Sequence, residues 1–242
     1  MSVLQAEPAT RERAPEASGI TYWHEGLECC DAVWEAAYAR FETPEEEIDK
    51  FTKRFHRLGV DRMARDLDIV DLFCGRGNGL VALQRLGFNN LEGVDLSPSL
   101  LKQYEGDAKL YVADCRDLKF ESESKDLMIV QGGLHHLPTV PEDLTAVLSE
   151  VQRVLKPGGR FAIVEPWWTP FLRAVHSACE VKLFRRCYAK LDALAVMTER
   201  EATTYFQWLG QPKVIQAELD RHFDRELCKA SFGKLLYVGR KA

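Results

Sequence analysis

The sequence has no long apolar run. A membrane-spanning helix needs about 18 or more consecutive apolar residues, and no stretch of this chain approaches that length. The first residues also lack the basic segment followed by an apolar segment that is typical of a secretory signal. We therefore expect no integral membrane association and a cytoplasmic location.

The sequence also lacks an excess of positive charge. Its 32 lysines and arginines stand against 37 aspartates and glutamates, which gives a formal net charge of -5. Proteins that bind nucleic acid neutralise its phosphates with basic side chains. Because this charge balance provides no large positive field, we expect no nucleic acid partner.

The spacing of cysteine and histidine excludes the common disulfide and metal patterns. The seven cysteines are an odd number and form no CxxC pair, so we expect reduced thiols, as in a cytosolic protein. No HxxxH motif is present either. The sequence therefore predicts no metal site.

The sequence does contain a repeat of strands and helices from Asp68 onward. This alternation predicts a parallel sheet covered by helices on both faces. With 242 residues, 46% of them hydrophobic, the chain can bury one sizeable core. The expected strands are "IVDLF", "LEGVDL", "KLYVAD", "DLMIVQ" and "RFAIVEP", and a hairpin around Gly233 closes the sheet.

Two segments precede this repeat. Residues 1–19 are rich in Ala, Glu and Pro, a composition that predicts a disordered tail. Residues 20–67 predict two helices, the second of which begins with a capping box formed by Thr43 and Glu46.

Two segments follow the five-strand core of residues 68–166. Residues 167–210 predict a helical insertion, because so long a segment is unlike a plain loop. Thr198 and Glu201 predict a capping box inside it. Residues 211–242 predict a last helix and the closing hairpin.

Ligands of such a sheet bind beyond the carboxyl ends of the strands, where the strand order reverses. Gly75 and Gly77 follow the first strand and let the backbone approach a ligand closely. Asp95 ends the second strand 20 residues after Gly75, where a carboxylate can bind a ribose diol. A dinucleotide fingerprint requires GxGxxG, and Gly79 falls one residue short of its third glycine.

Five motifs occur in order: "VDLFCGRGNG", "LEGVDLSPSLL", "YVADCRDLKF", "DLMIVQGGLHHL" and "VLKPGGRFAIVEP". Together they resemble the class I S-adenosylmethionine-dependent methyltransferases, in the small-molecule branch that includes ubiquinone and menaquinone biosynthesis enzymes. The resemblance implies an α/β, Rossmann-like three-layer αβα sandwich with a mostly parallel seven-stranded sheet and an antiparallel C-terminal hairpin. It also implies S-adenosylmethionine as the cofactor, a small-molecule acceptor, and residues 20–242 as the methyltransferase domain.

The resemblance assigns cofactor roles to residues at the strand ends. Asp95 would hold the ribose hydroxyls, with Leu96 beside the adenine. Asp114 would meet the adenine amino group, and Cys115 would contribute backbone next to it.

At the methionine end, the resemblance places Asp71 near the methionine moiety and Gln131 near the sulfonium. Gly75 and Gly77 would line the cofactor. The family usually has glycine where this chain has Phe73. A side chain there is tolerable if the backbone keeps a strand-like φ.

His135, His136 and Glu165 are candidate catalytic residues by position, because they lie at strand ends that face the same crevice; His135 and Glu165 are preferred. A base can remove a proton from a phenol, an alcohol or an acidic carbon during methyl transfer, so O- or C-methylation is expected. The histidines of "LHHL" can instead cap the next helix, and Glu165 can instead be a partner for the insertion.

Two other classes of protein remain as alternatives to a methyltransferase. They are a cofactor-binding protein without transferase activity and a nicotinamide-dependent oxidoreductase.

Overall fold

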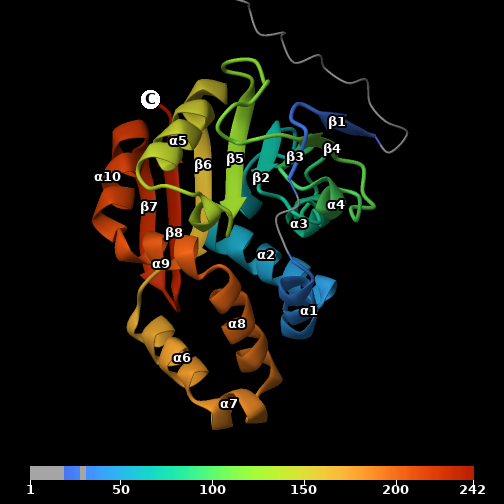
Figure 1. The fold of residues 1–242 in the computed structure, drawn as a ribbon. Helices are drawn as coiled ribbons and strands as arrows, with labels where there is room; N and C mark the ends of the chain where they lie inside the picture. Colours follow the sequence, from blue (N-terminus) through green and yellow to red (C-terminus); the bar gives the residue numbers. More distant parts are fainter. Residues whose placement is uncertain (1–18, 28–30) are drawn as a thin grey trace, which may run out of the picture.

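The computed structural model describes residues 19–27 and 31–242, so the expected tail lies, apart from Gly19, outside the described residues. Within these residues one sheet has eight strands in the order β1-β4-β3-β2-β5-β6-β8-β7 (Figure 1). The strands are β1 (Ile20–Tyr22), β2 (Ile69–Leu72), β3 (Leu91–Asp95), β4 (Lys109–Val112), β5 (Lys125–Gln131), β6 (Leu155–Pro166), β7 (Asp224–Ser231) and β8 (Lys234–Arg240).

The sheet confirms the expected α/β class. Strands β1 to β6 pair in parallel, whereas β8 pairs antiparallel with both β6 and β7. The additional strand is β1, which pairs with β4 at the sheet edge, Ile20 opposite Leu110. Its three residues are too few to show a strand period in the sequence.

The strand order reverses between β2 and β5. From β2 the chain proceeds outward through β3 and β4, and then returns to place β5 on the other side of β2. Leu72 is paired with Val130 at this boundary. The crevice beyond these two strand ends is therefore the expected ligand position for an open sheet.

Helices flank the sheet and extend beyond its carboxyl edge. They are α1 (Ala32–Phe41), α2 (Pro44–Leu58), α3 (Asn78–Arg85), α4 (Pro98–Leu101), α5 (Glu142–Val154), α6 (Pro170–Glu180), α7 (Lys182–Cys187), α8 (Ala189–Arg200), α9 (Ala202–Gly210) and α10 (Pro212–His222), with 3-10 turns η1 (Val60–Arg62) and η2 (Leu134–His136). Among the described residues, no helix combines the length and apolar character needed to cross a bilayer.

The local sequence of helix α2 determines where the helix begins and ends. Thr43 and Glu46 form the predicted capping box, and Pro44 occupies the first turn. Gly59 ends the helix in the left-handed conformation, at φ 76°. Its apolar residues Ile48 and Phe55 are buried against the sheet, so the amphipathic pattern places α2 across one face.

Two apolar clusters cover the two sides of the sheet. One contains residues of α2 and α3, among them Phe55 and Leu83, packed on Ile129. The other contains residues of α5 and α10, among them Leu148 and Leu219. The three layers hold the strand ends rigidly, which positions the residues that follow them.

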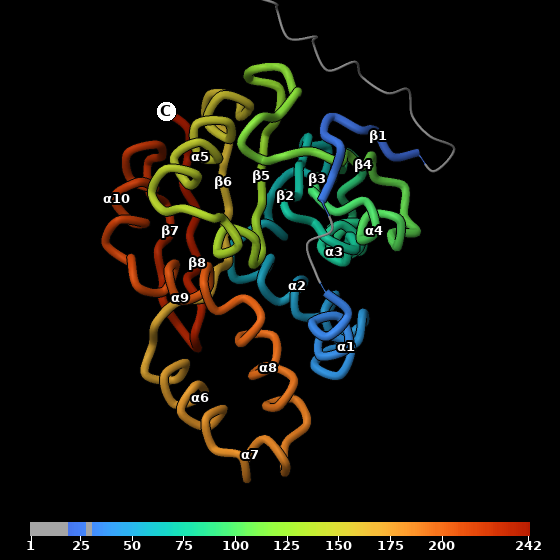
Figure 2. Tube along the Cα trace, in the orientation of Figure 1, coloured from blue at the N-terminus to red at the C-terminus, as the bar shows by residue number. Residues whose placement is uncertain are grey.

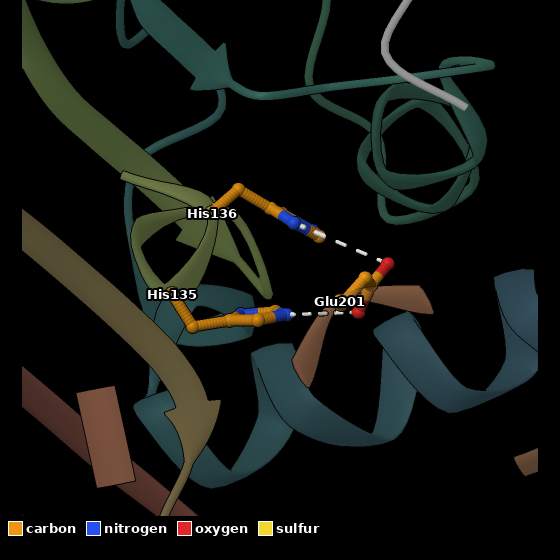
Figure 3. Close-up of side chains that lie close together, drawn as sticks. All are labelled: His135, His136 and Glu201. Atoms are coloured by element: carbon orange, nitrogen blue, oxygen red, sulfur yellow. Dashed lines mark ion pairs between the residues drawn. The ribbon is translucent and has the colours of Figure 1, made fainter. Parts of the chain in front are cut away.

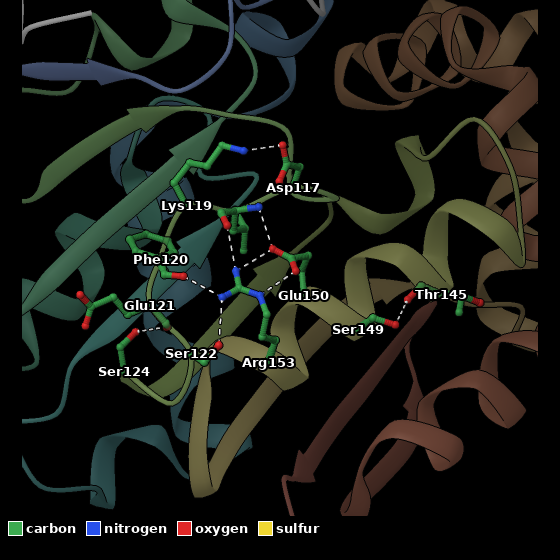
Figure 4. A network of polar contacts seen from close by, with 11 residues as sticks. Asp117, Lys119, Phe120, Glu121, Ser122, Ser124, Thr145, Ser149, Glu150 and Arg153 are labelled. Atoms are coloured by element: carbon green, nitrogen blue, oxygen red, sulfur yellow. Dashed lines mark hydrogen bonds and ion pairs between the residues drawn. The ribbon is translucent and has the colours of Figure 1, made fainter. Parts of the chain in front are cut away.

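Residues of α5 also fix the loop that follows β4. Arg153 donates hydrogen bonds of 2.8 Å to the carbonyl oxygens of Leu118 and Phe120 (Figure 4). Glu150 accepts from the Leu118 amide at 2.8 Å and pairs with Arg153. This network holds the loop that carries Asp114.

Helices α6 to α8 lie beyond the carboxyl edge of the sheet, and α9 leads the chain back to it (Figures 1 and 2). Helix α1 packs against α8. Ion pairs join the N-terminal helices to α8, with Arg40 3.0 Å from Asp192 and Lys190 2.8 Å from Glu46. We call α6 to α9 the lid, residues 170–210.

The predicted capping box of Thr198 and Glu201 is wrong. Thr198 lies inside α8, and Glu201 stands at the junction of α8 and α9 without capping either helix through its side chain. Burial of Thr198 in the lid overrides the local signal. The Glu201 carboxylate is thereby left for other contacts.

Candidate functional site

The turn after β2 runs through three left-handed residues, Phe73 (φ 55°), Gly75 (φ 53°) and Gly77 (φ 76°). A Cβ added at Gly75 would meet nothing within 4 Å, so space lies open there. A Cβ added at Gly77 would lie 2.3 Å from the ring of Tyr104. Gly75 thus leaves room for a ligand, whereas the room that Gly77 provides is used by Tyr104.

Phe73 does not keep a strand-like φ. Its left-handed backbone costs an L-residue about 1–2 kcal/mol. Packing offsets this cost, because the ring is partly buried against the apolar cluster. A Cβ on Gly133 would lie 2.3 Å from Cγ of Phe73, so the missing side chain of Gly133 makes room for the ring.

Asp95 holds the glycine turn in place. Its Oδ2 accepts from the Gly75 amide at 2.8 Å, and its Oδ1 accepts from the Ser97 amide at 2.9 Å. Burial raises the pKa of Asp95, while these backbone N–H groups oppose the rise. Each oxygen keeps a further lone pair for another donor.

Asp71 is buried beneath the same turn, 3% exposed. Burial, followed by the charges of Asp95 and Glu47, raises the pKa of Asp71 to about 8. A Cβ on Gly79 would lie 2.4 Å from Oδ2 of Asp71. The glycine that falls short of the dinucleotide spacing therefore makes room for this carboxylate.

Nothing in the sequence singles out Glu47. It lies on α2 and accepts a hydrogen bond from Asn78 Nδ2 at 2.8 Å and another from the Tyr38 hydroxyl. In the sequence it is one of several acidic residues in the first turn of a helix, which is an ordinary pattern. With Asp71 and Asp95 it makes three carboxylates around one turn.

Gln131 ends β5 across the crevice from that turn. Its Nε2 and Oε1 are both buried, and neither has a hydrogen-bond partner among the described residues. A buried polar group without a partner costs about 1–3 kcal/mol. This amide is therefore suited to a ligand that supplies both a donor and an acceptor.

The adenine-side candidates are held by protein contacts. Leu96 is half-buried, and its carbonyl accepts from the Leu27 amide at 2.8 Å. Asp114 pairs with Arg116 at 2.6 Å, so a ligand amino group would compete with that arginine. Cys115 is buried, and burial raises the pKa of its thiol.

Glu165 and His135 form a buried pair. Glu165 is 0% exposed, and its Oε2 accepts from Nδ1 of His135 at 2.8 Å. Its Oε1 accepts from the amides of Gly133 and Leu134, both at 2.8 Å. Burial alone would raise the pKa of Glu165, but the contacts with His135 and these amides hold it below its usual range.

The lid completes this end of the site. Nε2 of His135 lies 3.8 Å from Oε2 of Glu201, and Nδ1 of His136 lies 4.0 Å from Oε1 of Glu201 (Figure 3). Tyr205 of α9 packs edge-on against His135, with ring centroids 5.7 Å apart. Lys190 of α8 is exposed and pairs with Glu46.

Two cations lie near Glu165. The charge of Glu165 acts on the pKa of Arg54, on α2, and on the pKa of Lys234, at the start of β8. Burial and repulsion from Arg54 lower the pKa of Lys234 to about 7. Nothing in the sequence singles out Lys234, because its position follows only from the pairing of β8 with β6.

Comparison with known proteins relates the chain to methyltransferases. Residues 70–163 match the family model of a methyltransferase domain. The chain is 35% identical over 122 residues to an uncharacterized methyltransferase of Synechocystis sp., covering 47% of this chain and 54% of that protein. It is 28% identical over 124 residues to a demethylmenaquinone methyltransferase of Staphylococcus aureus, covering 46% and 50%.

The chain therefore spans about half the length of the curated relatives it matches. Two solved structures share the fold. A protein from Pyrococcus horikoshii has a TM-score of 0.64 at 20% identity, covering 88% of this chain and 100% of that one. A SAM-dependent methyltransferase from Methanosarcina mazei has a TM-score of 0.52 at 19% identity, covering 74% and 94%.

Proposed function

We propose that the chain transfers a methyl group from S-adenosylmethionine to a small-molecule or lipid-like acceptor. The match of residues 70–163 to the family model of a methyltransferase domain supports this proposal. Oxygen or an acidic carbon of the acceptor receives the methyl group. The demethylmenaquinone methyltransferase that this chain resembles over about half its length is consistent with such an acceptor.

The observation that carries the proposal is the concentration of carboxylates at the glycine turn. Burial and then the charges of Asp95 and Glu47 raise the pKa of Asp71, so repulsion between carboxylates contributes there. S-adenosylmethionine brings a sulfonium and an ammonium group, which relieve that repulsion. The diphosphate of a dinucleotide would increase it, so the charges favour the sulfonium cofactor over NAD.

The cofactor fits two further features of the described residues. The unpartnered amide of Gln131 can take a donor and an acceptor of the methionine moiety. The open side of Gly75 leaves the backbone accessible. We assign Asp71, Gly75 and Gln131 to the methionine end of the cofactor, and Gly77, whose side toward Tyr104 is filled, to the shape of the turn that lines it.

We assign the nucleoside to the residues beyond β3 and β4. Asp95, held in place by the amides of Gly75 and Ser97, would accept from the ribose hydroxyls through its remaining lone pairs. Leu96, Asp114 and Cys115 would surround the adenine, with Asp114 leaving Arg116 or sharing its oxygens with the ligand.

When bound, S-adenosylmethionine supplies a methyl group already activated by the sulfonium. The residues of this chain have to align the acceptor and exclude water. Nε2 of His135 accepts the proton that the acceptor loses. Glu165 fixes the orientation of the His135 ring, which leaves Nε2 directed toward the lid. Glu165 is then a positioning residue, because its oxygens are occupied by three N–H groups.

Calorimetry with S-adenosylmethionine, S-adenosylhomocysteine and NAD tests the cofactor. We expect the first two to bind and NAD not to bind, and binding of NAD alone would overturn the proposal. A methyl-transfer screen with labelled cofactor on phenolic, quinol and acidic-carbon acceptors tests the activity. If the chain binds the cofactor but transfers no methyl group to any of these acceptors, it is better described as a non-catalytic binding protein.

A further inference from the structure

Three potential ligand atoms converge where the lid meets the core. Nitrogens of His135 and His136 and an oxygen of Glu201 all lie within 4.8 Å of one another. The two histidines belong to η2, directly after β5, and Glu201 belongs to the lid (Figure 3). The cluster therefore joins segments separated by 65 residues of sequence.

The contacts within this cluster are too long for hydrogen bonds. The nitrogen-to-oxygen distances are 3.8 Å for His135 and 4.0 Å for His136, whereas N–H···O hydrogen bonds measure about 2.7–3.2 Å. Each oxygen of Glu201 is directed at a different ring. Ligands held about 2.1 Å from one ion lie about 3–4 Å apart, so a small inward rotation would place all three around a cation.

The surroundings of His135 resemble those of a metal ligand. A ligating histidine almost always donates its other ring N–H to a carboxylate or carbonyl, which fixes the tautomer and the ring orientation. Nδ1 of His135 makes this contact with Glu165 at 2.8 Å. Glu165 is itself held by two backbone amides, so Nε2 is presented to the cluster by a rigid support.

We propose that His135, His136 and Glu201 hold a divalent transition-metal ion such as Zn²⁺. Two imidazoles and one carboxylate suit Zn²⁺ or Fe²⁺ rather than Mg²⁺ or Ca²⁺, which prefer oxygen ligands. Three protein ligands leave a coordination position open, as in catalytic rather than structural zinc sites. The sequence predicted no metal, because adjacent histidines and a distant glutamate match no spacing motif.

The role of this ion rests on the proposed function. An acceptor hydroxyl bound at the open position would lose its proton to solvent more readily, as metal-bound water does. Its oxygen would then form a bond to the methyl carbon while the carbon–sulfur bond breaks and its electron pair goes to sulfur. The acceptor is thus methylated on this oxygen. Nε2 of His135 is then a ligand of the ion, and the ion takes over the part in deprotonation that this nitrogen would have without it.

The ion would also join the lid to the core. Glu201 comes from the lid, whereas His135 and His136 come from the strand-end loop. Loading of the site would therefore stabilise the closed arrangement over the acceptor. Binding of the ion to the folded chain alone would raise the thermal midpoint by mass action.

Titration of the untagged, EDTA-treated full chain with Co²⁺ tests the site without any methyl transfer. We expect one Co²⁺ per chain, with the visible absorption of a four- or five-coordinate ion, displaced by Zn²⁺ in competition. His136→Gln and Glu201→Gln should each weaken Co²⁺ binding at least about 100-fold, and Glu165→Gln should weaken it about 10–100-fold. His136 is partly exposed, so its variant is expected to fold.

Two variants serve as matched controls. Glu199→Gln changes an exposed lid glutamate that pairs with Arg185, and His56→Gln changes an exposed histidine of α2. Both should keep the wild-type Co²⁺ affinity and spectrum. Absence of a stoichiometric Co²⁺ site, or equal affinity in His136→Gln and wild type, would overturn the proposal.

The Co²⁺ titration and the calorimetry with S-adenosylmethionine test the ion and the proposed function separately. Calorimetric binding of S-adenosylmethionine with no Co²⁺ site would refute the ion and leave the methyltransferase, with His135 acting directly. A Co²⁺ site in a chain that binds no S-adenosylmethionine would support the ion and refute the methyltransferase.

Discussion

The two ends of the crevice are built differently. The cofactor end consists of strand ends and the turns that follow them. Asp95 accepts hydrogen bonds there from the backbone amides of Gly75 and Ser97. The acceptor end consists of His135 from the loop after β5, Glu165 from β6 and Glu201 from the lid. Local sequence sets the glycine turn and Asp95, whereas Glu47 joins the first end, and Glu201 joins the second, only through the packing of α2 and the lid on the core.

The charges differ as well. Three carboxylates surround the glycine turn, while histidines, Arg54 and Lys234 lie around Glu165. A cationic cofactor therefore has a preferred end. Perturbing one end should change cofactor affinity, and perturbing the other should change turnover.

Glu165→Gln should give the largest effect. The variant keeps an oxygen for the amides of Gly133 and Leu134 but loses the charge that orients His135. We expect kcat to fall about 10²–10⁴-fold, the usual contribution of acid–base groups. Cofactor affinity should change less than about threefold, because no cofactor contact is removed.

Steady-state kinetics and calorimetry on the same preparation measure both quantities. A parallel loss of cofactor binding would show that Glu165 supports the whole crevice, and the separation of the two ends would be wrong.

Asp95→Ala should act at the opposite end. Loss of one charge-assisted hydrogen bond to the ribose costs about 1.5–3 kcal/mol, or about 10–100-fold in the cofactor dissociation constant. Asp107→Ala, which removes an exposed aspartate of the loop before β4, is the matched control. Unchanged affinity for S-adenosylmethionine in Asp95→Ala would contradict the ribose assignment.

Cofactor affinity should depend on pH through Asp71. In the cofactor-free protein its pKa is about 8, so below that pH the carboxyl holds a proton that a cationic ligand must displace. Affinity should fall as pH is lowered below 8, by up to about tenfold per pH unit. Calorimetry between pH 6 and about 9 measures the dissociation constant of S-adenosylmethionine. In Asp71→Asn the affinity should not change with pH through this group.

The same pKa also affects stability. The folded pKa of about 8 exceeds the unfolded value of about 3.9. The protonated carboxyl therefore favours the fold at low pH, and this contribution is lost as pH rises from about 4 to 8. The thermal midpoint of Asp71→Asn relative to wild type should rise over that window, and a constant difference would refute the raised pKa.

Asp192→Asn should give the smallest effect. It removes the ion pairs of α8 with Arg40 and Arg185, both 3.0 Å long. These pairs are partly exposed, so we expect a loss of less than about 1 kcal/mol. Thermal unfolding should shift by no more than about 2–4 °C, and a larger shift would mean that the lid contributes strongly to global stability.

The core could be predicted because its signals are local. Buried parallel strands such as β2 are continuous apolar runs, and glycines and aspartates mark their ends. The backbone conformation of Phe73 could not be predicted from local signals, since its left-handed φ depends on the room that Gly133 leaves for its ring. The short strand β1 also depends on an exposed edge of β4 rather than on its own residues.

The order of strands and helices, the glycine turn and the acidic strand ends follow from the sequence, because they rest on periodicity and on backbone preferences of single residues. The grouping of Glu47 with Asp71, of Lys234 with Glu165 and of Glu201 with the two histidines does not. These groups come from segments far apart in the chain, and their distances are set by how α2, β8 and the lid pack on the sheet. Ligand chemistry at the acceptor end is therefore a property of that packing.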